Sequence, residues 1–171
     1  MRQLRAGELD VIIAFNVLDD QDISIQKTRD YDIGLIATPG VLPAGGKVAD
    51  LLCACADFPL CLPDSSLSLW PRLDGEFTRM RVQPKGLVNT NSVELIRAYI
   101  RRGEYMGVLT WLDVVHDVSA GVLCFQALDN LRLRETLCLC TRYGGGVPAA
   151  VMAELSQMFE ALPQTGQRLN V

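Results

Sequence analysis

The sequence predicts an α/β fold in which most of the strands run parallel. Strand-like and helix-like segments alternate along much of the chain, as in folds built from βα units. Residues 9–15 are apolar except for Asp10, which is typical of a strand buried on both faces of a parallel sheet. A well-marked helix spans residues 92–102, and an amphipathic helix follows the last strands. We therefore expect helices packed against a central sheet.

The first part of the chain predicts a helix end followed by three strands. Residues 1–15 suggest the end of a helix, a turn and a strand, and polar residues 16–22 suggest a loop. Residues 23–28 alternate between apolar and polar, and residues 31–37 form another apolar run. We expect two separate strands there, followed by Gly- and Pro-rich turns over residues 38–46.

The middle of the chain predicts short elements. Residues 48–54 suggest a short helix, and residues 58–62 suggest a strand. Residues 70–85 suggest a helix followed by a strand near residues 80–82, and a short strand is expected at residues 87–88.

The helix at residues 92–102 has clear start and stop signals. Asn91 is a suitable N-cap, Glu94 completes a pair resembling a capping box, and Gly103 supplies the stop. Basic residues near its end complement the helix dipole, and we expect them to form a solvated face rather than a DNA patch. Those residues are Arg97, Arg101 and Arg102, opposite an apolar stripe of Val93, Ile96, Tyr99 and Ile100.

The last part of the chain predicts a strand at residues 107–112, a helix over residues 112–118, and two strands at residues 122–128 and 131–141. A final helix begins near Pro148 and ends before Pro163. It carries an apolar stripe at helical spacing, made of Met152, Leu155, Met158, Phe159 and Leu162.

Charge and hydropathy exclude several classes of protein. The net charge of −4 gives no sign of a basic nucleic-acid surface. The longest nearly apolar run, residues 51–63, is too short to span a membrane, and residues 1–15 do not form a signal peptide. We expect a cytoplasmic protein with no membrane association.

The cysteines and other chemically active residues do not form a catalytic or metal-binding motif. The single histidine, His116, has no cysteine at metal-ligand spacing, and the glycines at residues 144–146 lack the Lys-Ser/Thr of a phosphate loop. We expect no enzyme activity, cofactor or metal, and we expect reduced, buried thiols. The six cysteines are Cys53, Cys55, Cys61, Cys124, Cys138 and Cys140.

Several segments, taken in order, carry a family resemblance. They are residues 4–13 (Leu-Arg-Ala-Gly-Glu-Leu-Asp-Val-Ile-Ile), residues 35–43 with their two prolines, residues 88–92 before the capped helix, and residues 103–110 after it. In this order they resemble the effector-binding domain of LysR-type transcriptional regulators. One departure is that three residues separate Gly103 from Gly107, where the family usually has one.

The resemblance implies a fold like that of type 2 periplasmic binding proteins, with two Rossmann-like subdomains joined by two crossing hinge strands. Residues 1–37 and 136–171 would form subdomain I, and residues 38–135 would form subdomain II. Subdomain I would be incomplete, because its first strand-helix-strand and the preceding winged helix-turn-helix have no counterpart. We expect such a chain to associate through exposed sheet edges and helix-packing surfaces.

The resemblance also implies a small-molecule effector held between the subdomains. The predicted contacts are Phe15 and Asn16 after the first strand, Thr38 at the hinge, residues 89–92 at the helix entry, and Thr110. The four residues of the helix entry are Asn89, Thr90, Asn91 and Ser92. That entry has a physical basis, because the first turn of a helix presents free N–H groups to an anion. The alternative is that Asn91 only caps the helix and its neighbours are solvated.

Two functions are consistent with these features. The first is the effector-sensing regulatory domain of a LysR-type DNA-binding regulator that binds a small, anionic organic ligand. It would contact DNA only through a missing N-terminal winged helix-turn-helix, and it would form homo-oligomers. The second is a two-lobed small-molecule-binding protein or an enzyme that reuses the same fold.

Overall fold

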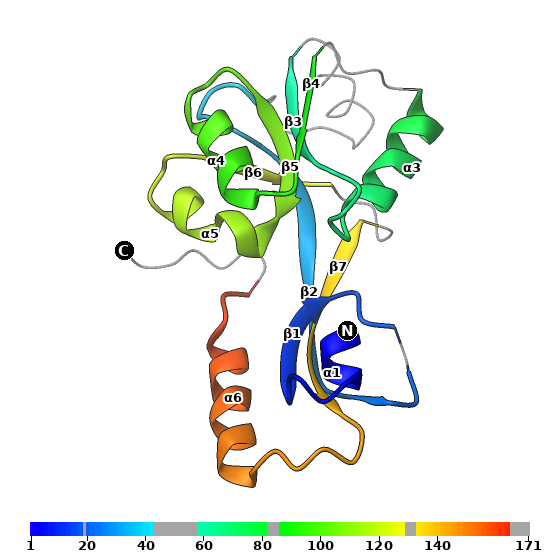
Figure 1. Cartoon of the computed structure of the whole chain (residues 1–171). Coiled ribbons are helices and arrows are strands. Elements are labelled where there is room, and N and C mark those ends of the chain that lie inside the picture. The colour runs from blue at the N-terminus through cyan, green and yellow to red at the C-terminus, as the bar shows by residue number, and fades with distance from the viewer. Residues whose placement is uncertain (19, 43–57, 82–85, 129–132, 165–171) are drawn as a thin grey trace. The chain divides into compact units, whose positions relative to one another are not determined.

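The chain forms two compact units. The computed structural model describes residues 1–18, 20–42, 58–81, 86–128 and 133–164. Unit 1 consists of Met1–Tyr31 and Glu135–Gln164, and unit 2 contains Asp32–Arg134. The chain crosses between them within β2 (Ile23–Ala37) and near the start of β7 (Arg134–Arg142) (Figure 1).

Unit 1 contains a small antiparallel sheet with the strand order β1-β7-β2. Strand β1 (Val11–Phe15) pairs antiparallel with β7, so that Val11 lies opposite Thr141 and Phe15 lies opposite Leu137. Helix α1 (Arg2–Arg5) packs on this sheet through Leu4, which is fully buried. Leu4 belongs to one core cluster with Ile12, Val17, Ile23, Cys138 and Cys140.

Helix α6 (Ala149–Ala161) is attached to β2 through Arg29 and Lys27, which both form ion pairs with Glu160. The Arg29 guanidinium lies 5.6 Å from the centre of the Phe159 ring, and it donates a hydrogen bond to the Glu160 carboxylate at 2.9 Å. Of the predicted apolar stripe on this helix, Phe159 is buried, whereas Met158 is 63% exposed. Met152, Leu155 and Leu162 are half-buried, so the stripe is covered along the helix except at Met158.

Two expectations for unit 1 are wrong. Strand β1 is not buried on both faces of a parallel sheet, because it pairs antiparallel with β7 and Ile13 is 51% exposed. Residues 23–28 and 31–37 do not form separate strands. They belong to the single strand β2, which pairs with β7. The polar residues between Ile25 and Tyr31 are exposed or half-buried, but they do not interrupt the strand.

Unit 2 is built on a mixed sheet. The second half of β2 pairs antiparallel with β5 (Met106–Thr110) and with β6 (Cys124–Ala127). Strand β3 (Leu60–Pro63) pairs parallel with β5 and with β4 (Leu87–Thr90). The prediction of mostly parallel strands therefore holds only for β3, β4 and β5, which follow one another through helical crossovers.

Helices cover both faces of the unit 2 sheet, as Figure 1 shows. Helix α3 (Trp70–Met80) packs on one face, where Leu73 and Phe77 meet Ile33, Leu35, Leu60 and Leu62 of the strands. Helices α4 (Val93–Arg101) and α5 (Trp111–Ser119) pack on the other face. That second core joins Ile36, Cys61, Ile96, Ile100, Leu109, Val114 and Leu123. Successive side chains of β2 and β3 thus pack into opposite cores, because neighbouring residues of a strand point to opposite faces of the sheet.

Further expectations concern elements of unit 2. The strand predicted near residues 80–82 is wrong for its first two residues, because α3 continues to Met80 and Arg81 caps it with a φ of 54°. The helix predicted at residues 48–54 lies outside the described residues. The strands expected near residues 58–62, 107–112 and 122–128 are confirmed with shifted ends.

No helix in the described part of the chain is long and apolar enough to cross a membrane.

Candidate functional site

Three parallel strands of unit 2 end at one edge of the sheet. Pro63 at the end of β3 pairs with Thr90 at the end of β4, and β5 ends at Thr110. Binding sites of open α/β sheets commonly lie outside the carboxyl ends of parallel strands. This edge carries Asn89, Thr90, Asn91, Ser92 and Thr110, which are five of the eight predicted ligand contacts.

The entry of α4 is capped by Ser92, not by Asn91. The Ser92 Oγ accepts a hydrogen bond from the Leu95 N–H at 3.2 Å, and the Thr90 Oγ1 accepts one from the Ser92 N–H at 3.2 Å. The prediction that Asn91 is the N-cap is therefore wrong, because the helix starts one residue later than expected. Asn91 and Asn89 are exposed. The backbone N–H groups of Val93 and Glu94 have no partner among the described residues.

Thr110 caps the next helix, α5. Its hydroxyl donates to the Asp113 carboxylate at 2.7 Å, while the Asp113 N–H donates back to Thr110 Oγ1 at 3.4 Å. Thr110 is only 1% exposed. The Thr110 N–H also donates to this carboxylate, at 3.1 Å. Burial raises the pKa of Asp113, and the bonds from the hydroxyl and the N–H of Thr110 partly oppose that rise. The Thr110 side chain is thus engaged in a capping box that the sequence analysis did not identify.

Thr38 lies at the opposite edge of the same sheet. Strand β2 is antiparallel to β5, so that Ile33 pairs with Thr110 and Ile36 pairs with Gly107. The chain therefore reaches Thr38 beside the amino end of β5. A Cβ on Gly103, just after α4, would lie 3.7 Å from Thr38 Oγ1, which places Thr38 by the far end of that helix. Since α4 is about 13 Å long, the structure does not bring Thr38 together with Ser92.

Phe15 and Asn16 lie in unit 1, beside a cavity of about 390 Å³. Its other lining residues include Met1, Arg5, Val17, Leu18 and Asp20, and Arg5 forms an ion pair with Asp20. The ring of Phe15 meets the ring of Tyr31 edge-on at 6.3 Å. These two predicted residues thus share a cavity, which the sequence did not reveal.

Asn16 has an uncommon backbone conformation, and two hydrogen bonds hold its side chain in place. Its φ is 53°, in the left-handed region that Asn tolerates better than most residues. Its amide donates to the Glu135 carboxylate at 2.7 Å, and its side-chain oxygen accepts from the Thr136 N–H at 3.1 Å. Asn16 therefore ties the end of β1 to the start of β7.

The turn after β3 adds polar groups that the sequence analysis missed. The Asp64 N–H donates to the Thr90 carbonyl at 3.0 Å, which places this turn at the edge described above. The Asp64 carboxylate accepts from the Ser66 hydroxyl at 2.6 Å and from the Ser66 N–H at 2.8 Å. These bonds lower the pKa of Asp64. The sequence Pro63-Asp64-Ser65-Ser66 is a recognisable signal for such a turn.

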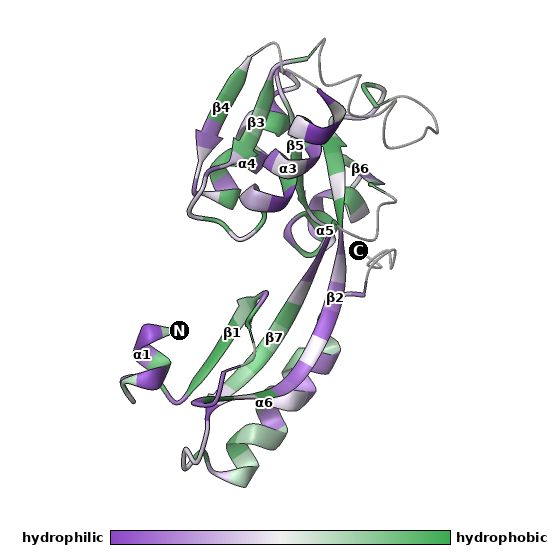
Figure 2. Ribbon diagram, turned by 90° about the vertical axis from the view of Figure 1, so that its right-hand side faces the viewer, coloured by the Kyte–Doolittle hydropathy of each residue, from purple (hydrophilic) through white to green (hydrophobic). Residues whose placement is uncertain are grey.

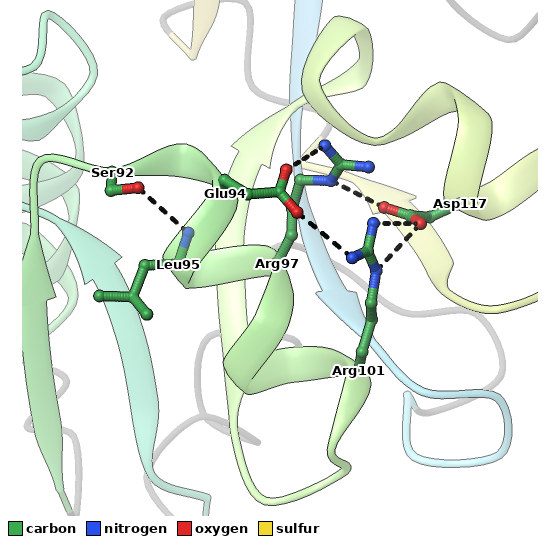
Figure 3. Close-up of polar contacts among 6 residues, drawn as sticks. All are labelled: Ser92, Glu94, Leu95, Arg97, Arg101 and Asp117. Atoms are coloured by element: carbon green, nitrogen blue, oxygen red, sulfur yellow. Dashed lines mark hydrogen bonds and ion pairs between the residues drawn. The ribbon is translucent and has the colours of Figure 1, made fainter.

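The arginines of α4 form an ion-pair cluster instead of the expected solvated face (Figure 3). Arg97 and Arg101 both donate to the Asp117 carboxylate of α5 at 2.8 Å, and both also contact Glu94. The Asp117 side chain is only 9% exposed. The expectation is wrong for these two residues, because α5 supplies a buried partner that lies 20 residues from Arg97 in the sequence. Arg102 pairs with Glu104 and is largely exposed, as expected.

Among the cysteines in the described part of the chain, Cys61, Cys138 and Cys140 are buried, as predicted, whereas Cys124 is half-buried. Burial raises the pKa of Cys61 and of Cys140 to about 11, so both are thiols at neutral pH. Cys138 and Cys140 share one face of β7, as their spacing predicted. Cys53 and Cys55 lie outside the described residues. The described residues contain no cluster of three His, Cys, Asp or Glu side chains that could hold a metal.

Comparison with known proteins identifies the family. The LysR substrate binding domain model matches residues 1–162, so the chain belongs to that family. The chain is thereby placed among the effector-binding regulatory domains of transcription regulators, which are not enzymes. Among curated proteins, none matches the sequence significantly.

Solved structures of this family share the fold. The CcmR regulatory domain of Synechocystis PCC6803, solved in complex with 2-PG, is 16% identical, with a TM-score of 0.71 over 94% of this chain and 77% of that one. The effector-binding domain of QuiR, solved with shikimate, is 12% identical, with a TM-score of 0.69 over 94% and 75%. Full-length CbnR, solved with its target DNA, is 15% identical, with a TM-score of 0.64 over 95% and 55%. At these identities the likeness establishes the fold, which is that of type 2 periplasmic binding proteins.

Proposed function

We propose that this chain senses a small organic anion at the carboxyl edge of the parallel strands of unit 2. Units 1 and 2 would correspond to regulatory subdomains I and II of the family. The ligand would contact Thr90, Asn91 and Ser92, with Asn89 at the rim. Phe15 and Asn16 beside the unit 1 cavity are a second set of proposed contacts. Thr38 is left out of this proposal because it lies at the other edge of the sheet.

The observation that carries the proposal is the geometry of the α4 entry. Thr90 and Ser92 are fixed by their own hydrogen bonds, and the N–H groups of Val93 and Glu94 have no partner in the described part of the chain. An anion placed there would accept two backbone hydrogen bonds and gain from the helix dipole. The 2-PG and shikimate complexes of relatives support a small organic acid as the class of ligand.

The Thr110 side chain has a smaller part in this proposal. Its hydroxyl is buried and bonded to Asp113, so it would shape the edge by holding α5 in place. Direct ligand contact would require the capping box to open. We therefore propose a positioning role for Thr110.

A thermal-shift screen followed by calorimetry tests the proposal. The probes are 2-PG, shikimate and a panel of small mono- and dicarboxylates, tested on the wild-type chain and on two variants. For any acid that binds, Thr90→Ala should weaken binding by about tenfold through loss of one hydroxyl contact. Thr38→Ala is the matched control at the opposite edge and should leave the affinity unchanged. Equal losses in both variants would argue against the unit 2 edge.

We further propose that these 171 residues do not bind DNA by themselves. The net charge of −4 supports this, since DNA binding requires cationic neutralisation of phosphates. The full-length relative solved with DNA extends well beyond the region matched here, which is 55% of its chain. A mobility-shift titration with duplex DNA at low salt should show no complex, and salt-dependent retardation would contradict the proposal.

A further inference from the structure

Helix α4 carries an acidic residue, Glu94, in its first turn. As Figure 2 shows, this helix combines hydrophobic residues with hydrophilic ones. The hydrophobic Ile96 and Ile100 pack in the core of unit 2, whereas the Glu94 side chain is 66% exposed. The Glu94 carboxylate therefore belongs to the surface of the same helix turn at which the anion is proposed to bind.

A carboxylate in the first turn of a helix is a suitable partner for the free N–H groups there. Negative charge near a helix N-terminus gains from the dipole, and side chains commonly satisfy the unpaired N–H groups of the first turn. The N–H groups of Val93 and Glu94 have no partner in the described part of the chain. They are therefore available to the Glu94 carboxylate as well as to a ligand, which makes Glu94 an internal competitor for an anion.

Two arginines on the same helix hold this carboxylate away from the entry. Glu94 Oε2 accepts a hydrogen bond from Arg97 Nη1 at 2.8 Å, and Glu94 Oε1 accepts one from Arg101 Nη1 at 3.3 Å. Figure 3 shows the Glu94 side chain directed toward both guanidinium groups. Arg97 lies about one turn and Arg101 about two turns further along α4. Both therefore draw the carboxylate away from the N–H groups of the first turn.

Asp117 of α5 fixes the two guanidinium groups in turn. Its carboxylate accepts from Arg97 Nε at 2.8 Å, and from Arg101 through Nε at 3.1 Å and Nη2 at 2.8 Å. Each guanidinium thus keeps its Nη1 for Glu94. The four side chains carry two positive and two negative charges, so the cluster adds no net charge to the binding edge.

We propose that Arg97 and Arg101 are positioning residues for the binding edge, because they restrain the Glu94 carboxylate and so keep the N–H groups of Val93 and Glu94 free for a ligand. This inference rests on the proposed function for its effect on affinity, but not for the position of the carboxylate. Without the two arginines, the Glu94 carboxylate turns back to the first turn of α4 and competes with the anion.

NMR of the full chain tests the position of the carboxylate without any ligand. The three-residue variant combines Arg97→Gln, Arg101→Gln and Asp117→Asn, which removes the partners of Glu94 and leaves no buried charge unpaired. The Val93 amide proton should move downfield in this variant, since it gains a carboxylate acceptor. It should return to its original position when Glu94→Gln is added.

Arg102→Gln is the matched control for these spectra. It lies on the exposed end of α4, where Arg102 pairs with Glu104, and it changes the net charge by the same one unit as the three-residue variant. The Val93 amide proton should not move in this control. It should also stay in place when Glu94→Gln is made alone, because the native carboxylate is already turned away.

Calorimetry with 2-PG, shikimate or another small acid that binds measures the effect on affinity. The three-residue variant should bind the acid about three- to fivefold more weakly, and adding Glu94→Gln should recover this loss. A merely structural role of the arginines predicts a loss that Glu94→Gln does not recover, which would overturn the proposal.

The amide shifts decide the proposal even without a ligand. A Val93 amide proton that does not move in the three-residue variant, or that stays moved after Glu94→Gln is added, would overturn it. A shift caused by Glu94→Gln alone would overturn it as well, and this single variant keeps the test available if the three-residue variant does not fold. If no acid binds any of these proteins, the proposed function fails, while the shifts still test the role of the two arginines.

Discussion

The carboxylate of Asp117 on α5 lies 2.8 Å from the guanidinium of Arg97 on α4 (Figure 3). This ion pair joins the two helices that cover one face of the unit 2 sheet. Because α4 begins at the proposed binding edge, the pair also fixes the helix that presents Ser92.

Asp117→Asn should lower the free energy of unfolding by about 2 kcal/mol. The variant keeps the shape of the side chain but removes the buried carboxylate that both guanidinium groups share, which leaves them only the exposed Glu94 as an anionic partner. Urea denaturation at neutral pH measures the loss. Glu104→Gln is the matched control, since the Arg102–Glu104 pair is exposed and should contribute no more than about 0.5 kcal/mol. Equal losses would show that the enclosure of Asp117 is unimportant.

The stabilisation by Asp117 should also depend on pH. Burial raises the pKa of Asp117, but the bonds and charges of Arg97 and Arg101 outweigh it and hold the pKa below its ordinary 3.8. A carboxyl with a lowered folded-state pKa contributes fully above its unfolded pKa, and the contribution is lost as pH falls through the folded value. The stability difference between wild type and Asp117→Asn should thus be constant above about pH 5 and shrink below about pH 4. Urea titrations across that range measure it, and a difference that grows in acid would contradict the assignment.

The position of the helix cap gives a third prediction. Ser92→Ala should cost about 1 kcal/mol, because the Leu95 N–H loses its acceptor. Asn91→Ala should change stability by no more than a few tenths of a kcal/mol, since Asn91 precedes the cap and is exposed. The two free energies of unfolding, measured side by side, decide between the two cap positions, and the reverse order would restore Asn91 as the cap.

The sequence was sufficient to predict most elements, because hydrophobic periodicity and local caps are encoded over short stretches. The family was predicted from the resemblance of several motifs taken in order. The sequence did not predict long-range pairings. The ion-pair partner of Arg97 is Asp117, which lies 20 residues away, and no local sequence pattern around Arg97 predicts this pairing. The continuity of β2 was missed because its polar middle resembles a loop, although those residues belong to a long strand. For the site, the sequence located the α4 entry but could not show that Thr38 lies at the other edge, since this depends on the antiparallel pairing of β2 with β5.

Close packing against β2 gives a fourth prediction, at Gly34. A Cβ at this position would lie 2.5 Å from the Phe125 ring and 2.7 Å from the Gln126 carbonyl of β6. Gly34→Ala should therefore cost about 2 to 3 kcal/mol, because backbone on a paired strand must move. Gly75→Ala is the matched control, since Gly75 lies in α3 with open space around it and should gain about 0.5 to 1 kcal/mol. Thermal unfolding of both variants measures these shifts, and a neutral Gly34→Ala would contradict the packing described.

The central claim is that a small organic anion binds at the carboxyl edge of unit 2. Amide chemical-shift mapping by NMR during titration with 2-PG, shikimate or another acid that stabilises the chain tests it most directly. We predict that the largest shifts fall on residues 90–95, with the Val93 and Glu94 amides moving furthest. Largest shifts around Thr38 and Gly103, at the opposite edge, would contradict the claim.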